Sequence, residues 1–358
     1  MHFEFSDDQR LFQTTLRDFL RKECPPDAVR ALWESESGRS DALWQRLAEL
    51  GLPGILAPAA RGGLGMDEVD LVLPMEELGR AAVAEPLVAT GAVGVPLLAA
   101  LGGRFEGWLE RAASGEARIA VGHPISPFVA DAHVAHLLLL ASGDELHALA
   151  TDPRDPAGVA VSLTRQPAND PARRLYSVAW TPSAATRVAE GATARRLLDA
   201  VLDRGALASA AQLVGVADQL IELGVAHACQ REQFGRPIGG FQAVQHLLAN
   251  AKLRLEYARP VVYRAAHSVA HATPTRAVDV SHAKLAAGEA AAHAARAALQ
   301  VHGAIGYTWE QDLHIWMRRA WSLELDWGSG AFHRGRVADA VLAPDALIGP
   351  GCTFEGGE

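Results

Sequence analysis

Four long helical segments in the C-terminal part of the chain limit most strongly what this sequence can fold into. Apolar residues follow helical spacing over residues 192–230, 241–271, 277–301 and 311–342. Glycine and proline separate these segments at Gly235–Pro237, Thr273–Pro274 and Gly303–Gly306. Because alanine, glycine and serine fill many positions, the helix backbones can approach one another closely. The pattern predicts an up-and-down bundle of four long helices with a large face for association.

The N-terminal part of the chain is typical of shorter helices. Ser6 lies where an N-cap is expected, Gln9 occupies the capping-box position, and Phe5 is placed to pack as a hydrophobic staple. A second helix is predicted over residues 41–50. A glycine-rich loop at residues 62–65 then leads into a third helix. Nothing in this part repeats at a fixed period, so a solenoid is not predicted.

The sequence changes character between residues 117 and 191, where short apolar or alternating runs lie between prolines. The run AHVAHLLLLASGDELHALATDP predicts two strands joined at Ser142–Asp144, and GVAVSLTRQ and LYSVAWTP predict two more. Such short strands indicate a small β-domain with a modest core. We therefore predict a mainly α fold with a small β-domain: an N-terminal helical domain (1–116), a reduced middle β-domain (117–191) and a C-terminal helical bundle (192–358).

Composition and charge exclude several classes of partner. The chain has 358 residues, with 33 Lys+Arg against 42 Asp+Glu and a formal net charge of −9. This acidic balance argues against nucleic acid or an anionic membrane surface as the main partner. The uncharged stretch 86–103 contains two prolines and four glycines. These residues favour buried helices and turns over a membrane span.

Cysteine and histidine positions indicate neither a disulfide framework nor a metal site. Cys24, Cys229 and Cys352 are widely spaced and form no CxxC motif. His267 and His271 stand four residues apart on a predicted helix, but no third ligand follows at a recognisable spacing. The acidic N-terminus lacks the layout of a signal peptide. We expect a cytoplasmic protein that binds no metal.

Four sequence strings carry a resemblance to a known family. They are LWQRLAELGLPGILAPAARGGLGM, MEELGR, REQFGRPIGGFQAVQH from residue 231, and QVHGAIGYTWEQDLHIWMRRA from residue 300. These strings and the helical–β–helical order resemble the FAD-dependent acyl-CoA dehydrogenase family over nearly the whole chain. By contrast, residues 62–65 neither follow a strand nor complete a GxGxxG motif, so a Rossmann phosphate loop is not predicted.

The resemblance implies a homomeric or heteromeric tetramer in which FAD lies in a cleft shared by two subunits. Eight residues would reach a neighbouring subunit's FAD: Arg231, Gln233, Phe234, Ile238, Phe241, Gln300, Gly303 and Gly306. Arg231 would pair with the pyrophosphate, since a guanidinium offers fork-shaped donors to phosphate oxygens. Gln233 would add a hydrogen bond, and the three apolar residues would wall the adenine side. The glycines would let the backbone approach the cofactor, although the family's second turn glycine is Ala304 here.

Each assignment has a structural alternative. Arg231 could instead pair with Glu232 or Glu222 on a solvated face. The two phenylalanines could be ordinary core residues. Gln300 could be an ordinary residue near a helix end.

The chain lacks a carboxylate at both positions where the family places its catalytic base. That base removes the α-proton of an acyl thioester while the β-hydrogen leaves as hydride to flavin N5. One position, 27 residues after the glutamine, falls on Trp327, and the other, 26 residues before the arginine, falls on Gly205. Asp326 and Asp203 lie nearby as candidates for a displaced base, with solvated surface aspartates as the alternative. We assign no confirmed catalytic residue.

The predicted β-domain also departs from the family pattern. It lacks the Thr-Glu-Pro-x-x-Gly-Ser-Asp-like and Trp-Ile-Thr-Asn strings that hold the isoalloxazine in the family. The half-site that grips the subunit's own flavin is therefore eroded, while the half-site that serves the neighbour's flavin is kept.

Three hypotheses follow from this pattern. The chain could be the base-less subunit of a heterotetrameric acyl-CoA dehydrogenase, completed by a homologous Glu-bearing subunit. It could be a homomeric flavoenzyme with a displaced base, or a non-enzymatic scaffold or regulator that binds no flavin. In the first two, the substrate is an acyl-CoA or acyl-carrier thioester whose acyl chain the sequence does not identify.

Overall fold

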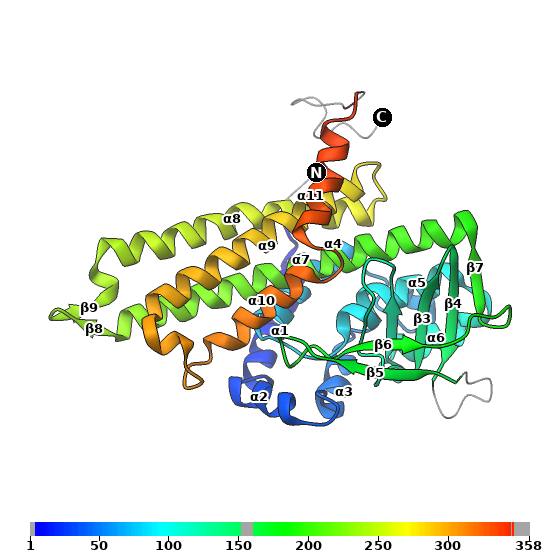
Figure 1. Cartoon of the computed structure of the whole chain (residues 1–358), viewed down its shortest axis with the longest axis horizontal. Helices are drawn as coiled ribbons and strands as arrows, with labels where there is room; N and C mark the ends of the chain where they lie inside the picture. The colour runs from blue at the N-terminus through cyan, green and yellow to red at the C-terminus, as the bar shows by residue number, and fades with distance from the viewer. Residues whose placement is uncertain (1–3, 152–159, 345, 347–358) are drawn as a thin grey trace. The chain divides into compact units, whose positions relative to one another are not determined.

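A computed structural model describes residues 4–151, 160–344 and 346 of the chain (Figure 1). The helices are α1 (Asp7–Glu23), α2 (Pro26–Glu34), α3 (Asp41–Glu49), α4 (Glu68–Arg80), α5 (Val95–Leu101), α6 (Glu106–Ala113), α7 (Gly191–Gln230), α8 (Gln242–Ala270), α9 (Arg276–His302), α10 (Leu313–Leu325) and α11 (Gly330–Val341). The strands are β1 (Ile119–Gly122), β2 (Val129–Ala130), β3 (Leu137–Ser142), β4 (Glu145–Ala150), β5 (Ser162–Gln166), β6 (Leu175–Ala179), β7 (Arg187–Glu190), β8 (Glu232–Gln233) and β9 (Arg236–Pro237).

The chain divides into two compact units that interleave along the sequence. The first, the bundle unit, comprises Met1–Pro26, Val72–Val83 and Ser209–Glu358, and the second, the sheet unit, comprises Asp27–Leu71 and Ala84–Ala208. Helices α4 and α7 each contribute residues to both units. Boundaries at residues 116 and 191 therefore do not coincide with the compact units, and the three-domain division stays a prediction. Strands β1–β7 do all lie between Ile119 and Glu190.

Helix α1 of the bundle unit begins with the capping box that the sequence predicts. The backbone N–H of Gln9 donates to Ser6 Oγ at 3.2 Å, and the backbone N–H of Ser6 donates to Gln9 Oε1 at 2.8 Å. Phe5 is buried and meets the Tyr263 ring of α8 edge to face, with centroids 4.8 Å apart. The Arg10 guanidinium lies over the Phe5 ring, 5.2 Å from its centroid.

The bundle unit is built on close contacts between helix backbones. Figure 1 shows α8 and α9 running side by side, and the buried face of α9 is mostly alanine. At the crossing of α4 and α7 only glycine fits. A Cβ on Gly215 would lie 1.8 Å from the Glu76 carbonyl oxygen, and a Cβ on Gly79 would lie 2.1 Å from the Gln212 carbonyl oxygen. Small residues thus bring these helices together, as the sequence predicts.

The prediction of one long helix over residues 311–342 is wrong. The segment forms two helices, α10 and α11, separated at residues 326–329. Trp327 and Gly328 have φ values of +54° and +104°, which no α-helix accommodates. Ser329 then caps α11 by accepting a hydrogen bond from the Phe332 backbone N–H. The other three long helices and the breaks between them are confirmed.

The sheet unit contains two small sheets. The four-stranded sheet has the order β1-β3-β4-β7, with β1 parallel to β3, and the three-stranded sheet has the order β2-β6-β5. Strands β3 and β4 form the predicted hairpin, in which Ser142 pairs with Glu145. The four predicted strand runs are therefore confirmed as β3, β4, β5 and β6.

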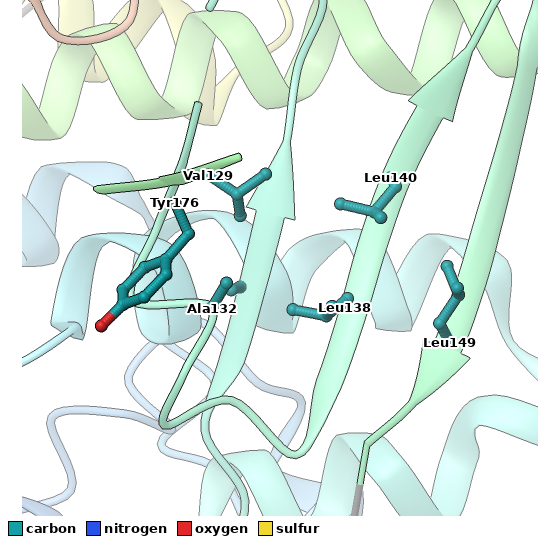
Figure 2. Close-up of a cluster of buried hydrophobic side chains, with 7 residues drawn as sticks. Val129, Ala132, Leu138, Leu140, Leu149 and Tyr176 are labelled. Carbon is teal, nitrogen blue, oxygen red and sulfur yellow. The ribbon is translucent and has the colours of Figure 1, made fainter. Parts of the chain in front are cut away.

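A small cluster of buried side chains joins strands of both sheets, as Figure 2 shows. Its members include Val129 of β2, Leu138 and Leu140 of β3, Leu149 of β4 and Tyr176 of β6. Other side chains of the same strands, among them Ile119, Leu139 and Leu146, are also buried. The modest core expected for this region on its own therefore stays a prediction.

Two apolar stretches are buried within the protein. Most of the uncharged stretch 86–103 is buried, as a π-helical turn at Val88–Gly94 followed by α5. Among the described residues, α7 is the one helix long and apolar enough, by length and composition, to cross a membrane. Its most apolar window is 78% buried inside the protein, as in a core helix.

Candidate functional site

A short β-hairpin after α7 carries two of the predicted site residues, Gln233 and Phe234, and is flanked by two more, Arg231 and Ile238. Strands β8 and β9 pair antiparallel around Phe234 and Gly235, whose φ values are +54° and +77°. Two consecutive left-handed residues define a type I′ turn, which normally selects asparagine or glycine at its first position. A bulky residue here costs roughly 1–2 kcal/mol, yet Phe234 is 90% exposed and gains no burial in return. Such strain without compensation indicates a functional surface.

The aromatic residues of this hairpin region face one another. Phe234 and Phe241 meet edge to face with centroids 6.1 Å apart, and the Arg236 guanidinium lies 4.1 Å from the Phe241 centroid. Ile238 is half-buried and packs against Ala228 and neighbouring apolar residues of the bundle. The alternative that Phe234 is a core residue is therefore wrong, whereas Ile238 does help to close the end of the bundle.

The Arg231 guanidinium is exposed and forms no ion pair or hydrogen bond with any described residue. Its backbone is fixed, because its N–H donates to the His227 carbonyl and its carbonyl accepts from Ile238 N, both at 2.8 Å. Glu222, the alternative partner, pairs with Arg80 instead. The structure therefore shows no surface ion pair at Arg231 among the described residues. The positive charge of its guanidinium is available to bind an anion.

Gln233 and Gln300 are both exposed polar residues. The Gln233 side-chain amide donates to the Glu232 carbonyl at 2.7 Å, so one of its two N–H groups is already used within the hairpin. Gln300 lies near the end of α9. This position agrees both with a contact to FAD and with the alternative of an ordinary residue near a helix end.

The two predicted glycines after α9 are needed for different reasons. Gly303 ends the helix with φ +65°, and an added Cβ there would meet nothing within 4 Å. Gly306 is buried, and a Cβ there would lie 2.9 Å from His302 Cβ and 3.0 Å from Leu299 Cδ1. The glycine requirement at Gly306 therefore comes from packing of the turn against its own helix. Only at Gly303 is there open space for a ligand beside the backbone.

These segments meet at one end of the bundle unit. Ala228 of α7, Leu248 of α8 and Val301 of α9 form a buried cluster there, against which Ile238 packs. Figure 1 shows the β8–β9 hairpin at this end of α7 and α8. The His227 and His302 rings also stack here, with centroids 4.2 Å apart. Sequence reasoning missed this histidine pair, although His227 precedes Arg231 by one helical turn.

Trp327, at one family base position, is held in a fixed loop. It is 8% exposed, and its carbonyl accepts from His333 Nε2 at 3.0 Å. The buried Lys284 ammonium donates to the carbonyls of Leu323 and Glu324 at 2.8 Å and of Gly328 at 3.3 Å. Lysine thereby satisfies carbonyls that α10 leaves unpaired at its end.

The electrostatics of this loop keep His333 neutral. Burial lowers its pKa to about 4, with Lys284 acting in the same direction. Because a carbonyl only accepts, Nε2 carries the imidazole proton. Asp326 is half-buried and follows α10 directly, its backbone N–H donating to the Leu323 carbonyl at 3.2 Å. No carboxylate replaces the missing base at residue 327 itself.

The second family base position lies on α7 within the sheet unit. Gly205 is buried and offers no side chain. Asp203 is 2% exposed, so the alternative of a solvated aspartate is wrong at this position. Beside it, Arg204 Nε pairs with Glu68 Oε1 at 2.7 Å. A buried carboxylate therefore lies within two residues of the expected position.

Histidine and acidic side chains do not gather into a metal centre within the described part of the chain. No group of three or more His, Cys, Asp or Glu residues there could hold an ion. His267 and His271 instead stack ring to ring, with centroids 4.0 Å apart.

Comparison with known proteins identifies the protein family to which this fold belongs. Residues 6–116 match the family described as acyl-CoA dehydrogenase, N-terminal domain, and residues 195–342 match acyl-CoA dehydrogenase, C-terminal domain. The chain belongs to the acyl-CoA dehydrogenase family of oxidoreductases, whose members are FAD flavoproteins.

Individual relatives cover nearly the whole chain. The acyl-CoA dehydrogenase IpdE2 of Mycolicibacterium smegmatis is 33% identical over 88% of this chain and 93% of its own length. The butyryl-CoA dehydrogenase structure from Megasphaera elsdenii has a TM-score of 0.85 at 22% identity, covering 96% of this chain and 100% of that one. The ChsE4–ChsE5 complex from Mycobacterium tuberculosis has a TM-score of 0.83 at 24% identity, covering 96% and 99%. The predicted fold class is confirmed.

Proposed function

We propose that this chain is the base-less subunit of a heteromeric, FAD-dependent acyl-CoA dehydrogenase. It contributes half of an interfacial FAD site, and a homologous Glu-bearing subunit supplies the base. The observation that carries the proposal is Trp327: a buried indole, in a loop fixed by Lys284 and His333, stands where the family places its glutamate. The reaction is α,β-desaturation of an acyl-CoA or acyl-carrier thioester in the cytoplasm.

The residues at the end of the bundle unit fit the adenine and pyrophosphate part of FAD. Arg231 offers an unpaired guanidinium, which suits phosphate oxygens. Phe234 offers an exposed aromatic face, and Gly303 leaves open space beside its backbone. When bound, FAD accepts the hydride that leaves the β-carbon. This chain's part is to bind and orient the cofactor, while the partner's carboxylate takes the α-proton.

A two-chain assembly is supported by the ChsE4–ChsE5 structure, because that relative of the same fold is a complex of two named chains. In such an assembly one chain can lose its base without loss of activity, provided that the other keeps it.

The test is to express the chain alone and together with a Glu-bearing homologous chain, and to measure flavin absorbance per protomer with the mass in solution. We expect colourless or unstable protein from the single chain and a yellow heteromer from the pair. A yellow homotetramer with one FAD per protomer would overturn the proposal.

The homomeric alternative is favoured by one observation, the burial of Asp203. A carboxylate that is 2% exposed is shielded from solvent, as a group that takes a proton from a bound substrate must be. If the chain alone binds FAD and turns over, Asp203→Asn should abolish turnover without releasing flavin, and Asp326→Asn should not. If neither the chain expressed alone nor the co-expressed pair contained flavin, the hypothesis of a non-enzymatic scaffold or regulator would be favoured.

A further inference from the structure

Two histidines stand beside Arg231 at the end of the bundle unit. His227 of α7 and His302 of α9 stack with ring centroids 4.2 Å apart and ring planes at 23°. The Arg231 backbone N–H donates to the His227 carbonyl just past the end of α7, so the two residues are one turn apart, and the Arg231 charge acts on His227. Three groups that can each be cationic therefore meet at one place.

We infer that His227 and His302 belong, with Arg231, to the site that binds the phosphates of FAD, and that the pair takes up a proton when those phosphates bind. The inference rests on the proposed function, because it takes the FAD pyrophosphate as the ligand. It adds two binding residues and a proton linkage.

The tautomer of His302 shows why a proton is needed. Its Nδ1 lies 2.8 Å from the Ala298 carbonyl, and since a carbonyl only accepts, Nδ1 carries the proton. In the neutral ring Nε2 is then an acceptor, which repels a phosphate oxygen. Protonation turns Nε2 into a charged donor that a phosphate oxygen can accept.

The helix ends at this place make added positive charge necessary. Helices α7 and α9 both end here, and the C-terminus of a helix carries partial negative charge that disfavours an anion. The positive charge of Arg231 alone faces the partial negative charges at the ends of α7 and α9. A second positive charge from the histidine pair would offset them and hold the two negative charges of a pyrophosphate.

Without an anion, the surroundings keep His227 neutral. Burial lowers its pKa, and so do His302 from α9 and Arg231 from the end of α7. No carboxylate of the described residues is among the groups that act on it. A bound pyrophosphate supplies the missing negative charge, which raises the histidine pKa and draws in the proton.

The chain offers a matched control pair. His267 and His271 also stack, with centroids 4.0 Å apart and ring planes at 15°, toward the other end of α8. They lie far along the helix from the β8–β9 hairpin. Their substitution reports what loss of two histidines does without touching the proposed phosphate site.

The experiment measures FAD affinity of the purified full-length assembly by flavin fluorescence between pH 6 and pH 8. Titration calorimetry in two buffers of different ionisation enthalpy counts the protons taken up. The pyrophosphate of FAD does not titrate in this range. We expect FAD to bind more tightly at pH 6 than at pH 8, by up to about tenfold per pH unit, the limit that one linked proton sets. His227→Gln and His302→Gln should each remove most of the pH dependence and of the proton uptake, whereas His267→Gln with His271→Gln should remove neither.

The outcomes separate this inference from the proposed function. The inference would be overturned if FAD binding took up no proton and if the histidine variants kept the pH dependence of the wild type. If Arg231→Gln still weakened binding in that case, the proposed FAD site would stand. Absence of FAD binding at every pH would overturn both.

Discussion

Arg231 is the residue on which the proposed cofactor contact most depends. Its exposed guanidinium makes no ion pair with a described residue, whereas Arg80, Arg204 and Arg259 of the same fold are all paired. We expect Arg231→Gln to weaken FAD binding by about 10- to 100-fold, the worth of a charge-assisted hydrogen bond to phosphate. Arg231→Lys should recover part of the loss, since it keeps the charge without the fork. Flavin fluorescence titration measures both, with the surface variant Arg334→Gln as control.

Substitution of Phe234 should affect the thermal stability of the protein and its affinity for FAD in different ways. Asparagine suits the first left-handed position of a type I′ turn better than phenylalanine does. We expect Phe234→Asn to leave thermal stability unchanged or slightly raised, because the ring is 90% exposed. FAD affinity should fall, because the aromatic face is lost. A clear fall in melting temperature would show instead that the ring supports the fold. Phe332→Asn, which removes a half-buried ring on α11, is a contrast that should be destabilising.

At the scale of elements, the crossing of α4 and α7 depends on Gly215. Alanine usually stabilises a helix interior by up to about 1 kcal/mol relative to glycine. Here its Cβ would lie 1.8 Å from the Glu76 carbonyl oxygen, so the two helices must separate. We expect Gly215→Ala to destabilise the protein by about 1–3 kcal/mol in denaturant unfolding. Gly288→Ala on α9 is the control, because its nearest neighbour is 3.6 Å away. Equal effects at the two sites would contradict this account.

Glu85, between α4 and α5, places a buried carboxyl group with an unusual pKa beside the N-cap residue of α3. Glu85 Oε1 accepts from the Ser40 backbone N–H at 2.8 Å, while Oε2 has no hydrogen-bond partner among the described residues. The Arg118 guanidinium is 4.0 Å away. Burial raises the Glu85 pKa from 4.5 to about 7, against the opposing effect of Ser40 and Arg39.

The sign of the resulting pH dependence follows from linkage. Because the folded pKa is the higher one, the folded state binds the proton more tightly, so stability falls as pH rises from about 4.5 through 7. Glu85→Gln keeps the acceptor for Ser40 and removes the titration. We expect the fall in melting temperature between pH 6 and pH 8 to be smaller in Glu85→Gln than in the wild type. Identical pH profiles would contradict the assignment, and Glu110→Gln, an exposed glutamate of α6, is the control.

At the scale of the whole molecule, the split site predicts cofactor stoichiometry. If this chain serves only its neighbour's flavin, the heteromer should hold one FAD for each pair of chains. Extracted flavin measured against protein from quantitative amino-acid analysis gives the ratio. One FAD per chain would show that this chain's own β-region also holds an isoalloxazine.

The prediction of the α10–α11 region shows where sequence reasoning fails. Gly328, Ser329 and Gly330 are a break signal, but apolar residues keep helical spacing on both sides of it, and this spacing predicts one helix. The left-handed Trp327 and the Lys284 contacts that hold the loop depend on residues distant in sequence. Local propensity carries no information on such contacts, so they could not be predicted.

The sequence by itself determined the helical–β–helical order, the capping box of α1, the β3–β4 hairpin and the family, because these depend on local spacing and on strings of adjacent residues. It also showed that residues 205 and 327 hold no carboxylate. Only the tertiary structure decided that Arg231 is unpaired, that Asp203 is buried, and that His227 and His302 stack. Burial and pairing depend on which distant segments pack together, and a linear pattern does not specify that.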